Sequence, residues 1–288
     1  MEECGCSRQR VALRLIRFTW HSRCEMALEG TEILALELAT FEAWRAEEIV
    51  ALGPWRLRCM HGVTNRANSV WAGPGEPAGG FARAIAEVEA FYAERALPAI
   101  FQITPVADPR LDALLAARGY GSFDAVSFQV ADAARVAAIE PRPSASAACE
   151  SALSDAWFEV SGRRGRFRGD EIAVYRAFLE RLAGRAGFAS ACDPGGEIAA
   201  AGIAIAAVGL TIAAPPLAGV FSMLTLPERR RRGLADAVLG ASARFALTRG
   251  ATRLYLQVEI ENAAARALYA RAGFAEAYRY HYRRRAKP

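Results

Sequence analysis

The sequence predicts an α/β protein built from two tandem units, each a mixed, mostly antiparallel sheet flanked by helices. Strand-length apolar segments alternate with helical ones along the second half of the chain, and the same order recurs in weaker form in the first half. The copies also match in length, because Gly80 and Gly119 are 39 positions apart and Gly233 and Gly273 are 40 apart. An internal duplication is the simplest explanation of this recurrence.

The elements of the second half have the clearest patterns. Residues 218–226 (AGVFSMLTL) form an apolar run of strand length, and residues 234–248 repeat apolar positions at helical spacing. Residues 252–258 alternate apolar with polar side chains, as a half-buried strand does. Asn262 is placed to cap a further helix, and residues 277–285 form a last alternating strand with its tyrosines on one face.

The first half repeats this order of strands and helices. Its expected strands are residues 56–64, 69–73, 98–106 and 121–130, and its expected helices are residues 79–97 and 110–120. We therefore expect a disordered extension at residues 1–25, a degenerate unit at 26–135, a linker at 136–147 and a complete unit at 148–288.

The composition indicates a well-packed core and excludes several classes of protein. Hydrophobic residues make up 53% of the 288 positions and charged residues 23%. The uncharged run at 198–226 is interrupted by Pro215 and Pro216, so we expect two strands there and no membrane span. Six cysteines without CxxC spacing and three scattered histidines predict no metal site. Without a secretory leader pattern, we expect a cytoplasmic protein.

Positive charge concentrates in the second half and in one loop. Residues 1–140 carry a net charge of −4 and residues 141–288 one of +9, which favours an anionic partner for the second half. The segment 227–235 reads PERRRRGLA, between an expected strand and an expected helix. The first N–H groups of a helix have no intrahelical partner, and Gly233 lets a ligand approach the backbone. The loop is therefore predicted to bind a phosphate or pyrophosphate group.

These segments together resemble the GNAT superfamily of N-acetyltransferases. The acetyl-CoA signature of that superfamily is Gln/Arg-x-x-Gly-x-Gly/Ala, which is matched here by Arg230, Gly233 and Ala235. A second block of the superfamily is an Asn, a Leu-Tyr pair and a Gly-Phe pair, matched by Asn262, Leu268, Tyr269, Gly273 and Phe274. The resemblance covers residues from about 145 to 288, and the first half is similar to a degenerate copy of the same fold.

The resemblance implies acetyl-CoA as the cosubstrate, without a metal, and a set of residues that hold it. By resemblance, the backbone of Met223, Leu224 and Thr225 binds the pantetheine. The loop N–H groups that hold the pyrophosphate are those of Arg230, Arg231, Arg232, Gly233, Leu234 and Ala235. The side chains of Arg229 and Arg231 are candidates for the adenosine 3′-phosphate. The equivalent loop of the first half keeps its glycines but has no arginines, so no tight binding of CoA is expected there.

The resemblance also suggests the catalytic residues. Tyr269 takes the position of the superfamily's general acid, and Asn262 either binds the pantetheine or caps its helix. Where one branch of the superfamily has a glutamate base, this chain has Gln257. Glu259 on the same strand and His281 on the last strand are the candidate bases, and an amine that is already neutral would need no base beyond water. Trp157 and His281 are candidate contacts of the acceptor.

The function expected from these observations is direct acetyl transfer from acetyl-CoA to the amine of a small molecule or peptide. Two alternatives stay open. A catalytically silent CoA-binding sensor is suggested by Gln257, and a nucleic-acid-binding protein is suggested by the basic second half and the tail YRYHYRRRAKP. We expect neither a nucleic acid nor a membrane as partner, and a homodimer is left open.

Overall fold

A computed structural model describes residues 28–142, 145–162, 167–182, 184–192, 198–206 and 217–285. It confirms the predicted class, because helices flank a mixed sheet whose described strands are mostly antiparallel. The parallel pairs are β3 with β4 and β9 with β10, one in each half of the chain. The predicted extension at residues 1–25 lies outside the described part.

From β1 in the first half and from β7 in the second, the strands and α-helices follow one another in the same order, whereas the first half starts with one helix and the second with a strand and two helices. The first half, residues 28–132, contains α1 (Gly30–Ala43), β1 (Glu48–Leu52), β2 (Trp55–Cys59), the 3-10 turn η1 (Asn65–Ala67), β3 (Val70–Trp71), α2 (Gly80–Ala93), β4 (Ile100–Ile103), α3 (Pro109–Ala117) and β5 (Tyr120–Asp132). Helix α4 (Ala133–Ala137) follows. The second half, residues 145–285, contains β6 (Ser146–Glu150), α5 (Asp155–Gly162), α6 (Asp170–Glu180), β7 (Ala186–Cys192), β8 (Ile198–Ala206), β9 (Leu217–Thr225), η2 (Pro227–Arg229), α7 (Leu234–Thr248), β10 (Arg253–Glu259), α8 (Ala263–Ala272) and β11 (Ala275–Arg285).

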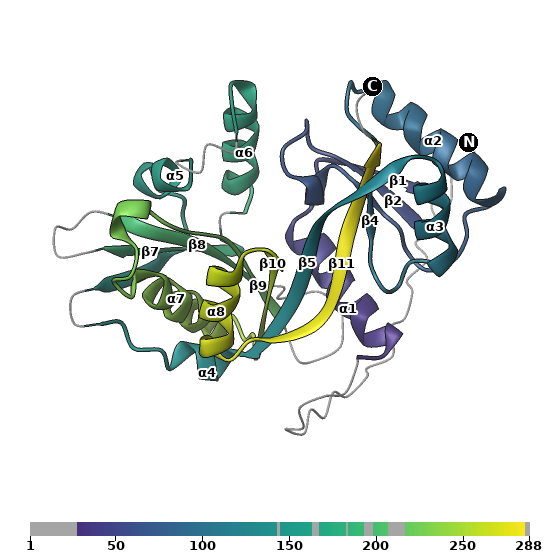
Figure 1. Cartoon of the computed structure of the whole chain (residues 1–288). Helices are drawn as coiled ribbons and strands as arrows, with labels where there is room; N and C mark the ends of the chain where they lie inside the picture. Colours follow the sequence, from purple (N-terminus) through teal and green to yellow (C-terminus); the bar gives the residue numbers. More distant parts are fainter. Residues whose placement is uncertain are drawn as a thin grey trace, which may run out of the picture.

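The halves share one sheet because their last strands are exchanged. The strand order is β1-β2-β3-β4-β11-β5-β10-β9-β8-β7-β6. Strand β11 of the second half therefore pairs with β4 of the first half, and β5 of the first half pairs with β10 of the second. The exchanged strands also pair with each other and cross the middle of the molecule side by side (Figure 1). The sequence predicts the strands but not this exchange.

Glycines with a left-handed backbone mark the duplication. Gly79 precedes α2 with φ 86°, and Gly233 precedes α7 with φ 79°. Gly119 follows α3 with φ 81°, and Gly273 follows α8 with φ 98°. Both pairs are 40 positions apart, so Gly79, not Gly80, is the counterpart of Gly233. Only glycine adopts such φ values without strain, which explains why both copies keep it.

Alternating side chains of the second-half strands pack into two hydrophobic cores, one on each face of the sheet. Leu254, Leu256 and Val258 of β10 pack with α7 and α8 on one face of the sheet. Tyr255 packs on the other face, in a core that also receives α1, α5 and α6. This assignment follows from the two-residue period of a strand. The helices α7 and α8 thus lie on the face opposite to α5 and α6 (Figure 1).

Helix α1, which the sequence patterns do not reveal, joins the two halves. Its residue Glu37 is only 2% exposed. The Glu37 carboxylate accepts hydrogen bonds from the hydroxyl of Tyr278 on β11 and, at 3.0 Å, from the indole N–H of Trp71 on β3. Burial raises the pKa of the Glu37 carboxyl. The helix therefore connects the exchanged strand β11 to the first half.

The segment predicted as a linker is partly ordered against the second half. Helix α4 packs on α7, where the guanidinium of Arg244 donates to the carbonyl of Ala137 at 3.0 Å. The predicted unit boundaries stay predictions, because the exchange of strands leaves no simple division between the halves.

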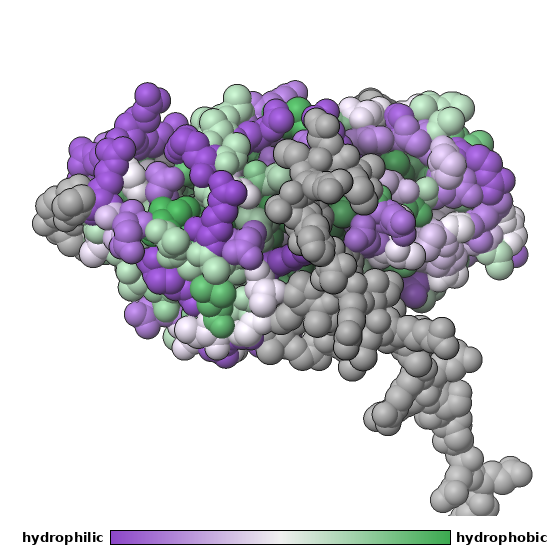
Figure 2. Space-filling view, turned by 90° about the horizontal axis from the view of Figure 1, so that it is seen from below, coloured by the Kyte–Doolittle hydropathy of each residue, from purple (hydrophilic) through white to green (hydrophobic). Residues whose placement is uncertain are grey.

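The surface gives no support for one assembly over another. Figure 2 shows hydrophilic side chains over much of both halves, with smaller hydrophobic areas between them. Among the described residues the large hydrophobic side chains that are exposed are Val50, Ile172 and Leu247, which lie on separate elements. The homodimer stays a prediction. None of the described helices is long and apolar enough to cross a membrane.

Candidate active site

The loop between β9 and α7 has the geometry of an anion site. Pro227 ends the strand and starts the turn η2, and Arg231 has φ 66°. Gly233 is the N-cap of α7, and it offers no side chain to the first N–H groups of the helix. Arg230, Arg231 and Arg232 are exposed beside these N–H groups. The predicted binding residues thus converge at one helix N-terminus, where the backbone favours negative charge.

A fifth arginine, which sequence reasoning missed, adds charge to the loop. The side chain of Arg142 lies against Gly233, because a Cβ atom on Gly233 would be only 2.8 Å from Cδ and 2.9 Å from Nε of Arg142. Arg142 belongs to the segment that follows α4, 91 positions before the loop. Its only sequence signal is that an arginine stands in an expected linker, which is too weak to identify it.

Strands β9 and β10 diverge next to this loop. Their parallel pairing runs from Leu217 opposite Arg253 to Val220 opposite Leu256, and it stops there. Both strands continue, to Thr225 and to Glu259, while their outer edges remain paired with β8 and β5. The positive φ of Ser222, 52°, coincides with an irregularity in the β8–β9 pairing. We call the gap between residues 221–225 and 257–259 the cofactor wedge.

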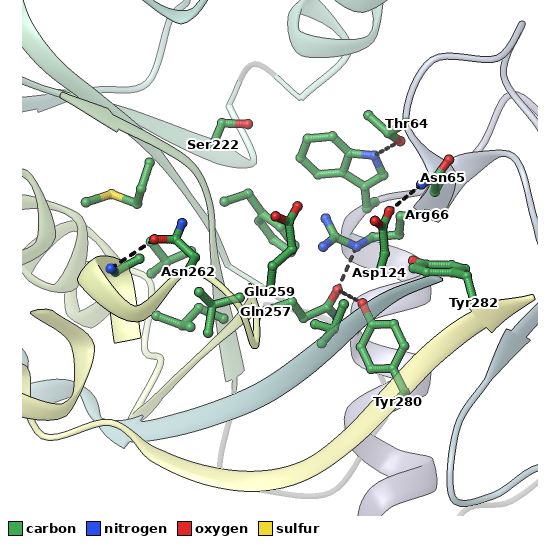
Figure 3. A pocket seen from close by; sticks show the side chains of 18 of the residues that line it. Thr64, Asn65, Arg66, Asp124, Ser222, Gln257, Glu259, Asn262, Tyr280 and Tyr282 are labelled. Atoms are coloured by element: carbon green, nitrogen blue, oxygen red, sulfur yellow. Dashed lines mark hydrogen bonds between the residues drawn. The ribbon is translucent and has the colours of Figure 1, made fainter. Parts of the chain in front are cut away.

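A pocket of about 420 Å³ extends from the cofactor wedge to the junction of the halves. At the end near the wedge it is lined by Met223, Leu256, Val258, Asn262, Ala265 and Tyr269. From the first half it is lined by Trp44, Thr64, Asn65, Arg66, Asp124 and Val126. The first half therefore supplies one wall of the pocket. Figure 3 shows this arrangement, with Glu259 between Asn262 and Ser222 on one side and Arg66 and Asp124 on the other.

Tyr269 and Asn262 lie at the cofactor end of the pocket. Tyr269 is 7% exposed and packs edge-on against Phe274, with the ring centroids 5.8 Å apart. The Asn262 side chain accepts a hydrogen bond from the backbone N–H of Ala265 at 3.1 Å, which confirms its role as the N-cap of α8. Binding of pantetheine by Asn262 stays a prediction.

Both ends of the Gln257 side-chain amide are hydrogen-bonded, and an amide is not a base near neutral pH. Its Oε1 atom accepts hydrogen bonds at 2.8 Å from Nε of Arg66 and from the hydroxyl of Tyr280. Its Nε2 atom donates to the hydroxyl of Thr40 at 3.4 Å. Burial holds the pKa of Tyr280 well above its usual value, so this phenol stays protonated and donates. The residue that departs from the superfamily pattern thus positions Arg66.

Two carboxylates face the pocket from neighbouring strands. Glu259 is exposed at the end of β10, opposite Val126 of β5. Asp124 lies two residues before Val126, with φ 46°, where the β5–β11 pairing is irregular. The side-chain amide of Asn65 donates to Oδ2 of Asp124 at 2.9 Å. Sequence reasoning proposed Glu259 but missed Asp124, because only the strand exchange brings β5 beside β10.

Two predicted acceptor contacts are corrected by the structure. Trp157 is 1% exposed, and its indole N–H donates to the carbonyl of Ala189 at 2.8 Å, so it is a core residue under β7. His281 is turned toward α3, where its Nε2 lies 2.8 Å from a carboxylate oxygen of Asp112. Neither residue lines the pocket. The side chain of Leu234 is also buried, so only its backbone N–H is available to a ligand.

The diverging strands, the anion site and the duplicated α/β units define the class of protein, the GNAT-type N-acetyltransferases. Solved structures support the fold. A GCN5-related N-acetyltransferase from Kribbella flavida superposes with a TM-score of 0.65 at 16% identity, covering 92% of this chain and 98% of its own. A tandem GNAT protein from the clavulanic acid biosynthesis pathway superposes with a TM-score of 0.56 at 16% identity, covering 76% of each chain.

The chain belongs to the family described as "Probable histone acetyltransferase Rv0428c C-terminal", which matches residues 30–283. It is also 28% identical over 254 residues to the "Uncharacterized N-acetyltransferase YobR" of Bacillus subtilis (strain 168), covering 88% of this chain and 98% of that protein. The chain is therefore an N-acetyltransferase of the GNAT type, as the motifs predict.

Proposed function

We propose that the protein transfers an acetyl group from acetyl-CoA directly to an amine held in the pocket between the halves. The observation that carries this proposal is that the cofactor wedge ends at the anion site of α7. A pantetheine needs an extended backbone edge, and a pyrophosphate needs N–H groups with positive charge around them. Residues 221–225 and the loop 229–235 offer these features in direct succession along the chain.

The residues around the wedge fit acetyl-CoA, which supplies an acetyl thioester to the site. Backbone groups of Met223, Leu224 and Thr225 would bind the pantetheine at the unpaired edge of β9. The N–H groups from Arg230 to Ala235 would hold the pyrophosphate, and the arginine side chains would add charge-assisted hydrogen bonds. Arg142 lies against the same loop and is expected to contribute to the same group.

The transfer needs a group that takes a proton from the acceptor ammonium and a group that gives one to the departing thiolate. The acceptor reaches the pocket as an ammonium ion, and Glu259 is the candidate to remove its proton. The amine nitrogen then forms a C–N bond with the thioester carbon while the C–S bond breaks. The departing thiolate gains a proton from the hydroxyl of Tyr269, and the second proton lost by the nitrogen passes through solvent to restore the Tyr269 phenol. The products are an N-acetyl amine and CoA.

Calorimetry with acetyl-CoA and a thiol-release assay with a panel of amines test the proposal. Tight binding of one acetyl-CoA per chain and acetylation of an amine are expected. The panel includes lysine peptides because of the family description. Binding without acetylation of any amine would favour the CoA sensor. Tight, salt-sensitive binding of DNA or RNA that acetyl-CoA does not change would favour the nucleic-acid alternative.

A further inference from the structure

Arg66 presents an unused pair of hydrogen-bond donors to the pocket. Its Nε atom donates to Gln257, and its guanidinium carbon lies 5.5 Å from the ring centre of Trp44 and 5.1 Å from that of Phe221. These contacts orient the guanidinium plane. Within the described part of the chain, the two terminal nitrogens have no hydrogen bond or ion pair, and Figure 3 shows the group directed into the pocket. A guanidinium presented in this way matches a carboxylate.

Asp124 adds a negative charge to the lining of the same pocket. The Asn65 amide, from the residue next to Arg66, fixes one oxygen of the Asp124 carboxylate, and the other oxygen remains. Arg66 and Asp124 both line the pocket but do not form an ion pair with each other. Opposite charges that line one pocket without pairing with each other are complementary to a ligand that carries both an ammonium and a carboxylate group.

A third charge lies nearer the cofactor wedge. Glu259 follows Gln257 by two residues on β10, so its side chain is on the same face and about 7 Å further along the strand. Gln257 is the residue that holds Arg66. On β5, Asp124 is two positions from Val126, the partner of Glu259, so it is also about 7 Å from Glu259 along the strands. Each of these two spacings is comparable to the length of an extended lysine or ornithine side chain. Figure 3 shows Glu259 between Asn262 on one side and Arg66 and Asp124 on the other.

We propose that the acceptor is a free diamino acid, of the lysine or ornithine type, that is acetylated on its side-chain amine. Arg66 binds its α-carboxylate, Asp124 binds its α-ammonium, and the side-chain amine reaches Glu259 at the wedge. This inference rests on the acetyl transfer proposed above. The α-ammonium stays protonated against Asp124 and is not a nucleophile. A lysine within a peptide has neither a free α-carboxylate nor an α-ammonium, so it leaves both charges without a partner.

Steady-state kinetics with matched acceptors tests the proposal. The acceptors are L-lysine, L-ornithine, lysine methyl ester, Nα-acetyl-lysine, cadaverine and a lysine peptide. Loss of one charge-assisted hydrogen bond is expected to lower kcat/KM roughly 10- to 100-fold for each altered acceptor relative to the better free diamino acid. Mass spectrometry of the product is expected to place the acetyl group on the side-chain nitrogen.

Two variants assign the contacts. Arg66→Gln is expected to bring the kcat/KM values of lysine and its methyl ester close together, whereas Arg66→Lys keeps part of the difference. Asp124→Asn is expected to do the same for lysine and Nα-acetyl-lysine. Arg45→Gln is the matched control, because Arg45 is an exposed arginine of the same half that does not line the pocket. Acetyl-CoA affinity, measured by calorimetry, reports whether each variant is folded.

The outcomes separate this inference from the proposed function. If acetyl-CoA binds but the peptide or cadaverine is acetylated at least as well as lysine and ornithine, the inference is wrong and the proposed function stands. Acetylation on the α-nitrogen, or an unchanged ester preference in Arg66→Gln, also overturns it. If acetyl-CoA binds and neither diamino acid is acetylated, the inference is wrong as well. If acetyl-CoA does not bind, the proposed function itself has failed.

Discussion

The loops before α2 and α7 both connect a parallel strand pair to a helix that follows a left-handed glycine, but they differ in the charge at the helix N-terminus. Before α2, the carboxylate of Glu76 accepts the backbone N–H of Phe81 at 3.2 Å and pairs with Arg110 at 2.9 Å. The chain itself thus supplies the negative charge at this helix N-terminus. Before α7, four arginines stand where the first half has Glu76, and Gly233 provides no side-chain cap.

The halves also differ in the strand that leads to the loop. In the first half, the parallel pairing ends at Trp71, eight positions before Gly79. In the second half, it ends at Val220, thirteen positions before Gly233. The five additional positions correspond in length to the part of β9 that borders the cofactor wedge. The second half therefore carries the proposed site for the cosubstrate, and the first half contributes one wall of the pocket.

The largest expected effect is on acetyl-CoA affinity, and it compares Gly233, the N-cap of α7, with Gly79, the N-cap of α2. Gly233→Val introduces a branched side chain at φ 79°, where the loop N–H groups must meet the pyrophosphate. Loss of two charge-assisted hydrogen bonds corresponds to about 3–6 kcal/mol, so acetyl-CoA affinity is expected to fall roughly 10²- to 10⁴-fold. Calorimetry measures this change.

The matched control is Gly79→Val, at φ 86° in the first half. It carries the same backbone strain, of about 1–2 kcal/mol in the free energy of unfolding, but we expect no change in acetyl-CoA affinity. Equal losses of affinity in both variants would show that strain, not the site, is responsible.

A second effect concerns the hydroxyl of Tyr269. By spacing from the terminal glycines, its counterpart in the first half is Leu115, which has no acid group. Tyr269→Phe keeps the packing on Phe274 and is expected to slow turnover roughly 10²-fold or more at nearly unchanged acetyl-CoA affinity. Tyr120→Phe is the control, because it deletes the same atom from a buried tyrosine of the first half. Unchanged turnover in Tyr269→Phe would remove this hydroxyl from the mechanism.

A smaller effect is expected from single arginines. Arg232→Ala removes one charge but leaves the backbone N–H groups, so acetyl-CoA affinity is expected to fall roughly 10- to 100-fold. The control is Arg110→Ala, which removes the arginine beside the equivalent cap of the first half and is expected to leave that affinity unchanged. Calorimetry at two salt concentrations separates a direct hydrogen bond to the phosphate from long-range attraction by positive charge. Salt strongly screens the long-range attraction but weakens a direct contact much less.

The smallest effect is on stability, and it concerns Glu76, whose carboxylate lies at the N-terminus of α2. Glu76→Gln weakens the cap of α2 and its pairing with Arg110, which is expected to lower the free energy of unfolding by about 1 kcal/mol. Denaturant titration measures this change. Glu87→Gln, in an exposed pair with Arg83, is expected to have almost no effect. A second acetyl-CoA bound by Glu76→Gln would show that Glu76 alone closes that site.

The candidate cofactor site could be recognised in the sequence because its parts are contiguous. The run from Met223 to Ala235 contains the strand, the loop and the helix N-terminus, and short-range patterns suffice to recognise them. Asn262 as an N-cap and Gly273 as a helix end are equally local features. The recurrence that predicts a duplication is also local, and the structure makes Gly79, not Gly80, the counterpart of Gly233.

The acceptor end could not be predicted, because it depends on contacts between distant segments. Arg66 reaches Gln257 across 191 positions, and Asp124 reaches the pocket only because β5 is exchanged. Helix α1 has no strong amphipathic pattern, since Glu37 is a charged residue that faces the core. Trp157 and His281 are predicted as acceptor contacts only from the segments in which they stand. The segment does not determine which way a side chain points.

The exchanged strands have a consequence for the order in which the protein can be completed during synthesis. While the ribosome is still making β6 to β10, one edge of β4 has no partner, because its neighbour β11 comes last. Exposed strand edges are sites of unwanted association, and pairing across such a sequence separation is slow. The sheet of the first half is therefore incomplete until β11 has been made, and until then the free edge of β4 is open to association with other chains.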